Sequence, residues 1–479
     1  MGHRFVLFCL RHAVGGVVSL GIACSAWAQA PVHQTADAWL APLPTASRGA
    51  DATALASWWQ RFDDPTLLRL QALARQASPD VASAQTRLMQ ARSVQVAAGA
   101  ALRPQVDASA SVMRGRPDLT TPLLTSAGVG LNASWLWDLA GGQQAARDAA
   151  TARQDMAQAA WHEARMSVAV SVASVYTQLR ACEAQRMLDE AEARSRDRSA
   201  GLVAHAAQVG LDAAAHAWLA QSAAAQARAT LVARALQCTQ LIQSLSVLTA
   251  EPELVLQDVL VAGHGRLPSP GALNVPAVPA QVLAQRPDVY RAERLVQAAA
   301  SEVMVADAEH QPRVSLTGSL GAGVLRVQGV HLDGPLLSIG PLQASLPLYD
   351  GGRREAQSAA ARAAWKEATT VYASVLRKAV SEVEEALLRM DAGQRRGREL
   401  QHALEGMGLA AKAAEARLVA GMASVLEVED ARRSLLALQA AELAQRKDMV
   451  DAWVALYTAL GGGWTPDLPA VDGKEFQRP

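Results

Sequence analysis

The chain has 479 residues, with 45 basic and 45 acidic side chains and therefore no net formal charge. Half of the residues are hydrophobic but only 4% are aromatic, which is typical of long helical bundles and coiled coils. No cluster of basic residues is interleaved with aromatic residues, so the sequence does not predict nucleic acid as a partner.

The N-terminal residues have the pattern of an export signal. Two arginines precede an apolar run, residues 13–27, that is too short to span a bilayer as a helix. The triplet Ala-Trp-Ala at 26–28 is typical of a signal-peptidase site and predicts a signal peptide over residues 1–28. The alternative is a lipid-modified Cys24, because residues 20–24 resemble a bacterial lipobox. Both alternatives predict a protein that leaves the cytoplasm.

The remainder of the chain consists of two copies of one large unit. Landmarks recur about 210 residues apart, among them Pro79-Asp80-Val81 with Pro287-Asp288-Val289, Pro104 with Pro312, and Gly141-Gly142 with Gly351-Gly352. That period is far longer than the roughly 20–50 residues of solenoid repeats. We therefore expect an N-terminal segment at 29–63, a first repeat at 64–250, a linker at 251–286, a second repeat at 287–463 and a C-terminal tail at 464–479.

Each repeat begins with a helix that ends at a proline. In the second repeat, Val and Ala recur at alternating three- and four-residue spacing through residues 289–306, which is the seam pattern of a coiled coil. Pro104 and Pro312 end these helices, because proline disfavours helical backbone in the residue before it. The linker and the tail are interrupted by prolines and show no helical periodicity.

A pair of strands follows each of these prolines. Residues 129–137, 314–320 and 342–348 alternate between apolar and small or polar side chains, and we expect loops at 114–126 and 327–336. One interpretation is the half-buried sheet of a soluble domain. The other is a membrane sheet, which the uncharged polar faces and strand lengths of about 9–11 residues favour.

The strands would have to carry the chain across a membrane, since no segment after the signal offers about 18 uninterrupted apolar residues. Trp135, Trp137 and Tyr349 lie at strand ends, where an interfacial aromatic girdle would be. Four strands cannot close a barrel, and open strand edges cannot face lipid. Three protomers would supply twelve strands, an even number within the range of bacterial barrels.

The longest predicted elements follow the glycine pairs. Residues 142–208 and 352–419 would each form a helix about 100 Å long at about 1.5 Å per residue. Apolar residues mark a buried stripe through 372–390. Gly210 and Gly421 are the expected turns, after which a second helix returns to about residues 248 and 460.

Two cysteines remain after cleavage of the signal. Cys182 lies 28 residues before Gly210 and Cys238 lies 28 residues after it, so an antiparallel hairpin would place both thiols at the same height. A disulfide is then feasible in an oxidising periplasm. The alternative is two buried free thiols on adjacent helices.

Several motifs resemble those of the outer-membrane efflux factors, the TolC-like family, and most closely the branch that serves resistance–nodulation–division pumps. They are Arg286-Pro287-Asp288-Val289, Gln311-Pro312-Arg313-Val314-Ser315-Leu316-Thr317-Gly318-Ser319, Pro347-Leu348-Tyr349-Asp350-Gly351-Gly352-Arg353-Arg354, Glu382-Val383-Glu384-Glu385-Ala386-Leu387 and Leu456-Tyr457-Thr458-Ala459-Leu460-Gly461-Gly462-Gly463-Trp464. The resemblance covers nearly the whole mature chain.

This resemblance implies a fold that is mainly α with membrane β. Four strands per protomer would complete a 12-stranded trimeric β-barrel in the outer membrane, and a long α-helical barrel would extend into the periplasm. The implied partners of the homotrimer are a periplasmic membrane-fusion adaptor, an inner-membrane efflux pump and outer-membrane lipid. The implied function is an exit channel for efflux. The alternatives are a type I secretion duct with the same fold and a soluble periplasmic coiled-coil scaffold.

Glu427 and Asp430 are the candidate gate residues. They lie three residues apart just beyond the Gly421 turn and therefore share a helix face. In the family, acidic residues at matching positions line the constricted periplasmic mouth. Three protomers would place six carboxylates around one axis, and basic neighbours such as Arg417 or bound cations would offset their repulsion. The alternative is a solvated helix face.

The two hairpin tips are the candidate docking sites for an adaptor, again by resemblance. They consist of Val209, Gly210 and Leu211 at the first tip and Ala420, Gly421 and Met422 at the second. Their alternative role is helix reversal alone, which glycine performs readily. We expect Arg432 and Arg433 at the surface or between protomers.

No motif predicts catalysis. The histidines and cysteines lack metal-ligand spacing, and the chain has neither a nucleophile-elbow motif nor a phosphate-binding loop. We therefore expect neither an enzyme nor a bound metal or cofactor. The sequence does not identify the transported substrate.

Overall fold

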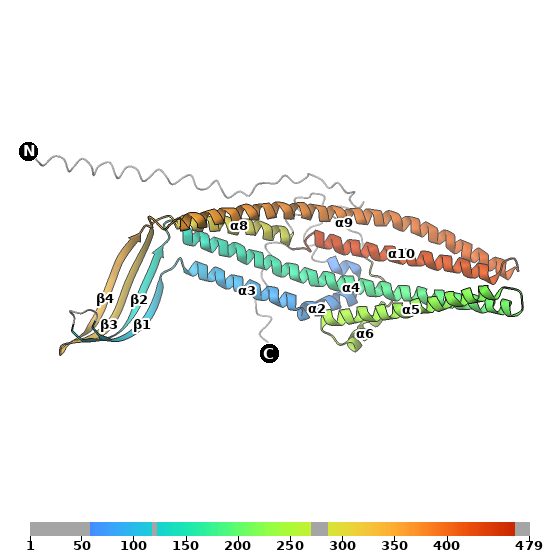
Figure 1. Cartoon of the computed structure of the whole chain (residues 1–479), viewed down its shortest axis with the longest axis horizontal. Helices are drawn as coiled ribbons and strands as arrows, with labels where there is room; N and C mark the ends of the chain where they lie inside the picture. Colours follow the sequence, from blue (N-terminus) through green and yellow to red (C-terminus); the bar gives the residue numbers. More distant parts are fainter. Residues whose placement is uncertain (1–57, 117–121, 270–285, 465–479) are drawn as a thin grey trace, which may run out of the picture. The chain divides into compact units, whose positions relative to one another are not determined.

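The computed structural model describes residues 58–116, 122–269 and 286–464 (Figure 1). The expected signal peptide and Cys24 therefore lie outside the described residues, as do most of the N-terminal segment, part of the linker and nearly all of the tail. The described residues form two compact units, the first with residues 91–155 and 292–373 and the second with the remainder. Both expected repeats contribute residues to each unit.

The first unit contains a four-stranded antiparallel sheet. Its strands are β1 (Gln105–Gly115), β2 (Leu124–Trp137), β3 (Arg313–Val327) and β4 (Val330–Ser345), and they lie side by side in chain order. Each expected repeat supplies one β-hairpin, and the β2–β3 ladder joins the two β-hairpins. As expected, the strands begin directly after Pro104 and Pro312.

The hairpin between β3 and β4 is tighter than we expected, and the predicted loop at 327–336 is wrong. The turn consists of Gln328 and Gly329 alone, with φ angles of 50° and 86°, a two-residue geometry that suits the twist of antiparallel strands. Residues 330–336 belong to β4. Pro335 suggested a loop, but β4 is an edge strand within the chain, where proline is tolerated. The predicted loop at 114–126 is likewise shortened at both ends by β1 and β2.

The duplicated Asp–Gly motif makes the turn from strand to long helix. Asp138 accepts hydrogen bonds from the backbone N–H groups of Gln143 (3.1 Å) and Gln144 (2.8 Å). Asp350 accepts hydrogen bonds from the N–H groups of Gly352 and Arg354, both at 3.1 Å. Each carboxylate thus satisfies N–H groups that the first turn of a helix leaves unpaired.

Gly321 lies where β2 and β3 approach each other closely, and we expect Gly321→Ala to weaken this ladder. An added Cβ would lie 2.5 Å from the carbonyl oxygen of Val129 and 3.0 Å from Cα of Gly130, so the backbone would have to move. A loss of about 1–3 kcal/mol is expected from such overpacking, measured as a lower thermal unfolding midpoint in detergent. Gly334→Ala in β4 is the matched control, because its added Cβ would meet no atom within 4 Å. Equal midpoints for the two variants would contradict the prediction.

The second unit contains two long helical hairpins. One joins α4 (Gly142–Gln208) to α5 (Ala214–Thr249), and the other joins α9 (Arg353–Val419) to α10 (Val425–Ala459). Both α4 and α9 are 67 residues long and begin in the first unit. The predicted helix lengths and both predicted turns are confirmed.

Four shorter helices and a 3-10 turn complete the described elements. They are η1 (Trp58–Phe62), α2 (Pro65–Ala77), α3 (Pro79–Ala100), α6 (Glu253–Val261) and α8 (Pro287–Ala308). The helix α6 was not expected, because the linker was predicted to lack helical periodicity. Leu256 and Leu260 are spaced one helical turn apart and are both buried, and nine residues are too few for a clear periodic signal.

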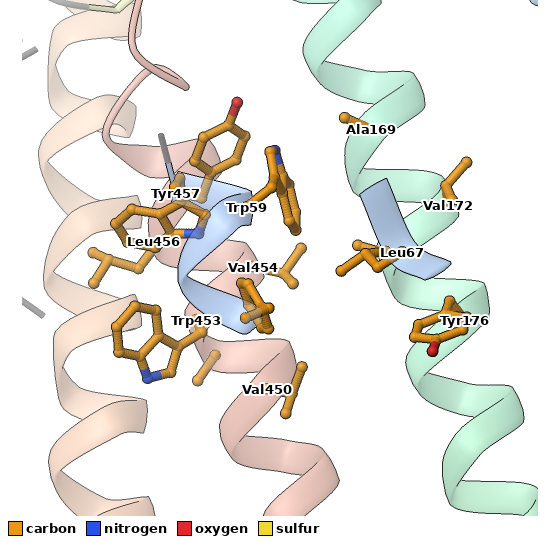
Figure 2. Close-up of a cluster of buried hydrophobic side chains, with 14 of the residues drawn as sticks. Trp59, Leu67, Ala169, Val172, Tyr176, Val450, Trp453, Val454, Leu456 and Tyr457 are labelled. Carbon is orange, nitrogen blue, oxygen red and sulfur yellow. The ribbon is translucent and has the colours of Figure 1, made fainter. Parts of the chain in front are cut away.

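The core of the second unit is aromatic where the N-terminal segment meets α10 (Figure 2). The ring of Trp58 lies 5.1 Å from that of Trp453, and the ring of Trp59 lies 4.9 Å from that of Tyr457, measured between centroids. The predicted stripe on α9 is confirmed, since Ala379, Val383, Ala386 and Met390 are all buried. Among the described helices, none combines the length and hydropathy required of a membrane span.

Candidate functional site

One face of the sheet is apolar and exposed. The register places side chains of this face opposite one another in every ladder, for example Ala108, Leu131, Leu320 and Leu337 in one row. On this face Val112 is 80% exposed and Ile339 is 87% exposed. A continuous apolar patch of this extent requires a partner or a lipid phase.

The opposite face carries mostly small residues. Asp107, Asn132, Ser319 and Ser338 form one row across the four strands, and the amide of Asn132 donates a 2.8 Å hydrogen bond to the hydroxyl of Ser109. Glycines occupy the neighbouring rows. The two faces together have the alternation that the sequence predicted for strands between lipid and a polar lumen.

The candidate girdle residues lie at the end of the sheet where the helices begin. Trp135 and Trp137 stack with ring centroids 6.2 Å apart, opposite Leu316 and Val314 of β3. The indole N–H of Trp135 donates to the carbonyl oxygen of Leu102 at 3.2 Å, so this group is already hydrogen-bonded within the chain. Trp137 and Tyr349 are exposed, and their role as a girdle stays a prediction.

The two hairpin tips are built alike. Gly210 and Gly421 have φ angles of 75° and 73°, and the residue after each glycine donates its N–H to a carbonyl five residues earlier, at 2.8 Å in both cases. This is the Schellman pattern, which ends a helix at a left-handed residue. Large apolar side chains are exposed around both turns, namely Val209, Leu211, Val419 and Met422.

The candidate gate residues are ion-paired within the single chain. Arg417 contacts Glu427 at 2.6 Å and also donates to the carbonyl oxygen of Met422 at 3.1 Å, so it braces the Gly421 turn. Asp430 pairs with Arg433 one turn further along α10. Ser424 caps α10 by accepting the N–H of Glu427 at 3.1 Å. Glu427, Asp430 and Arg417 thus lie in one charged cluster beside the second tip.

A buried acidic residue beside this cluster was missed by the sequence analysis. Glu429 is 2% exposed and accepts hydrogen bonds from Ser195 (2.5 Å), from Arg198 (3.0 and 3.2 Å) and from Arg432 (3.0 Å). Its partners on α4 precede it by more than 230 residues. The sequence signal for its burial was its position directly after the apolar Val428. Nothing in the local sequence identifies its hydrogen-bond partners.

Arg432 and Arg433 belong to this same network, and their expected place at the surface or between protomers stays a prediction. Arg432 also pairs with Glu415 of α9 at 2.7 Å, and Arg433 donates to the hydroxyls of Ser195 and Ser199 at 3.3 and 3.1 Å. The network connects α4 of the first hairpin with α9 and α10 of the second. It is therefore a polar junction between the two helical hairpins.

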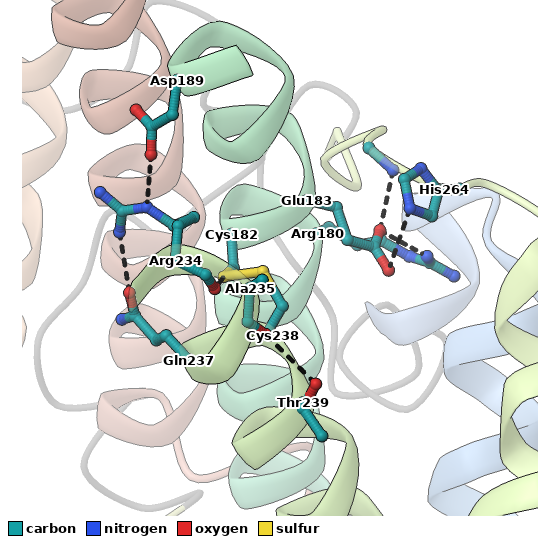
Figure 3. The surroundings of a disulfide bond; sticks show 11 residues. Arg180, Cys182, Glu183, Asp189, Arg234, Ala235, Gln237, Cys238, Thr239 and His264 are labelled. Atoms are coloured by element: carbon teal, nitrogen blue, oxygen red, sulfur yellow. Dashed lines mark hydrogen bonds and ion pairs between the residues drawn. A yellow bond between two sulfur atoms is a disulfide. The ribbon is translucent and has the colours of Figure 1, made fainter. Parts of the chain in front are cut away.

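The sulfurs of Cys182 and Cys238 are joined in a disulfide between α4 and α5, with Cα atoms 5.7 Å apart (Figure 3). Nearby, Arg234 of α5 donates to Asp189 of α4 at 3.0 Å. On the other side of α4, the buried Arg180 donates to the carbonyl oxygens of Leu260 and Ala262, at 2.9 and 2.8 Å. The disulfide and the Arg234–Asp189 pair thus connect α4 with α5, and Arg180 connects α4 with the C-terminal end of α6.

No group of three or more His, Cys, Asp or Glu side chains suited to a metal ion is found among the described residues. The candidate functional features of the described residues are a two-faced sheet in the first unit, and two glycine turns and a polar junction in the second. None of these features is a catalytic arrangement of the kind used for acyl or phosphoryl transfer.

The chain matches the sequence model of the family described as outer membrane efflux protein over residues 70–251 and 278–462. The pyoverdine export outer membrane protein OpmQ of Pseudomonas putida is 31% identical over 445 residues, which cover 89% of this chain and 92% of that protein. Nodulation protein T of Rhizobium leguminosarum bv. viciae is 26% identical, and the match covers 88% of each chain.

Two solved outer-membrane proteins share the fold. The outer-membrane channel OprN superposes with a TM-score of 0.74 and 26% identity, covering 91% of this chain and 99% of OprN. The outer membrane protein VceC of Vibrio cholerae gives a TM-score of 0.73 and 26% identity, covering 85% and 99%.

The predicted family, fold class, outer-membrane location and efflux function are confirmed by these comparisons, which favour a channel over a soluble scaffold. OpmQ is named as an export protein and OprN as a channel. Because the family model covers more than half of the residues and a relative of 31% identity matches nearly end to end, the chain belongs to the outer membrane efflux protein family.

Proposed function

We propose that three copies of this chain form the exit channel of a tripartite efflux pump, and that the channel conducts small molecules without catalysing a reaction. The sheet supports the trimer, because β1 and β4 each have an unpaired edge within the chain. Such edges cannot face lipid and must pair with neighbouring protomers. Twelve strands then close one barrel.

The relatives support a pump as the inner-membrane partner. The toluene efflux pump outer membrane protein TtgI of Pseudomonas putida is 28% identical over 86% of this chain. The exposed apolar side chains at the two glycine turns are suited to contact a periplasmic adaptor, and we propose residues 209–211 and 420–422 as this contact. A type I secretion engine is the alternative partner.

The two stretches matched by the family model support the proposed duplication. They cover residues 70–251 and 278–462, close to the repeats that we assign to 64–250 and 287–463. The stretch between them corresponds to the linker.

The charged cluster at the second tip supports a gate. Glu427 and Asp430 remain partly exposed although each is paired with an arginine, and a trimer would bring three such clusters near one axis. The local field of converging carboxylates attracts cations and excludes anions. The proposed gate can therefore be tested by measuring the ion selectivity of the channel.

Planar-bilayer recording of the purified protein tests the channel and the gate together. The wild type is expected to form cation-selective channels, and Glu427→Ala/Asp430→Ala to reduce the cation preference by about twofold or more and to change the conductance. Asp448→Ala is the matched control, because Asp448 is also exposed and paired with an arginine, Arg396, but lies far along α10 from the turn. Absence of any channel would contradict the proposed function. Unchanged conductance and selectivity in the double variant would contradict the gate alone.

A further inference from the structure

A row of polar and basic side chains crosses the sheet at its hairpin-turn end. The ladders place Arg114 of β1 opposite Thr125 of β2, Thr125 opposite Arg326 of β3, and Arg326 opposite His331 of β4. Side chains two residues apart on a strand share a face. Arg114 and Arg326 therefore lie on the same face as Val112 and Val324, the exposed apolar face.

The row lies one step beyond a band of apolar residues. From Val314 to Val324 the apolar face of β3 runs through Leu316, Gly318, Leu320 and Ala322. Ten residues at about 3.4 Å each, tilted by about 40°, span about 25 Å, the height of the apolar band of an outer-membrane barrel. The arginines therefore lie where the hydrocarbon ends and the headgroups begin.

This end of the sheet is opposite the ends from which the helices start, at Asp138 and Asp350. With the helices in the periplasm, the row faces the outer leaflet. This step rests on the channel orientation proposed above. In that leaflet the headgroups are phosphorylated glycolipid.

The side chains of the row are arranged to receive an anion. Arg326 donates its Nε–H to Nδ1 of His331 at 3.1 Å, which orients the guanidinium and keeps its two terminal nitrogens available. Arg114 is exposed and, among the residues that the structure describes, forms no ion pair. Arg116 follows two residues later, also exposed. The one acidic group of this row and its neighbours within the described strands is Asp333, 4.0 Å from His331.

We propose that Arg114 and Arg326, with His331 orienting Arg326, bind the phosphate groups of lipid A in the outer leaflet. Guanidinium groups bind phosphate through paired, charge-assisted hydrogen bonds. An arginine on the lipid face near the interface is tolerated, whereas one at the midplane would be strongly unfavourable. The apolar band below the row would pack against the acyl chains of the same lipid.

The test measures lipid binding to the detergent-solubilised oligomer by native mass spectrometry. The probes are bis-phosphorylated lipid A and the same lipid after enzymatic removal of both phosphates. We expect the wild type to bind the phosphorylated lipid about tenfold more tightly, and Arg114→Gln/Arg326→Gln to lose this preference. Each single variant is expected to lose about threefold of the preference for the phosphorylated lipid. The single variants replace the double variant in the test if the double variant does not assemble.

Arg313→Gln is the matched control, because it removes an exposed arginine from the opposite end of the same strand. It should bind both lipids as the wild type does. Equal binding of the two lipids by the wild type, or unchanged preference in the arginine variants, would overturn the proposal. Full competition by inorganic phosphate at millimolar concentration would also overturn it, by identifying a free anion as the ligand. None of these results would contradict the proposed channel function, whereas failure of the wild type to form an oligomer would overturn both proposals.

Discussion

Reduction of the Cys182–Cys238 disulfide is expected to destabilise the α4–α5 hairpin more than any substitution considered above. The bond closes a loop with a sequence separation of 56 residues. In the chain-entropy description, a cross-link of this span restricts the unfolded chain enough to stabilise the folded state by about 4 kcal/mol. The effect acts on the unfolded chain, so the helices themselves are expected to keep their positions.

Thermal unfolding followed by circular dichroism measures this effect. The midpoint of the wild type should fall when a reductant is added, to the value of Cys182→Ser/Cys238→Ser. The double variant is its own control, since reductant should leave its midpoint unchanged. A wild-type midpoint that does not respond to reductant would show that the contacts around the disulfide, such as Arg234 with Asp189, already suffice to hold the hairpin.

Replacement of Glu429 by alanine is expected to loosen the polar junction between the two hairpins and to raise channel conductance. The carboxylate is buried and receives hydrogen bonds from Ser195, Arg198 and Arg432. Its removal leaves those donors without their acceptor. Arg198 and Arg432 are about half exposed and can be rehydrated, so we expect a loss of about 2 kcal/mol and not the full loss of a deeply buried pair.

The measurements are the unfolding midpoint and the single-channel conductance. Glu405→Ala on α9 is the matched control, because Glu405 is exposed and such surface substitutions usually change stability by less than about 0.5 kcal/mol. If Glu429→Ala behaves as Glu405→Ala does in both measurements, the junction does not restrain the hairpins.

The same junction should be insensitive to mild acid. Burial by itself would raise the pKa of the Glu429 carboxyl, but hydrogen bonds from Arg198 and Ser195 and the arginine charges hold the pKa below its ordinary value of 4.5. A carboxyl with a lowered pKa in the folded state stabilises the fold above its ordinary pKa, and this stabilisation is lost as pH falls through the folded-state pKa. The junction is therefore expected to restrain the hairpins of the wild type equally from about pH 7 to pH 5, so that it causes no change in conductance over this range.

Local sequence patterns were sufficient for much of the architecture. Gly210 and Gly421 predicted both turns because a left-handed backbone favours glycine, and residues 314–320 predicted a strand through their strict alternation. The symmetric spacing of Cys182 and Cys238 about Gly210 predicted that the two thiols lie at the same height of the hairpin. The spacing alone could not distinguish a disulfide from two free thiols. These features depend on residues that are near each other in the chain or related by one hairpin.

What the sequence analysis missed depends on tertiary contacts. Trp58 and Trp59 lie in a five-residue 3-10 turn, too short for periodicity, and their burial depends on α10 nearly 400 residues later. The network of Glu429 joins residues 231–234 positions apart. In β4, Gly334 and Pro335 have the composition of a loop, and they form a strand because β3 pairs with them.

The ladder between β2 and β3 has a consequence for the order of folding. It pairs Leu124 with Val327 and Trp137 with Val314, residues about 180 to 200 positions apart. Synthesis and export of the first repeat alone therefore yield an isolated two-stranded hairpin, which is marginally stable at best. The strands can therefore insert only after the C-terminal half has been exported. Between export and insertion, the nascent chain depends on protection from aggregation.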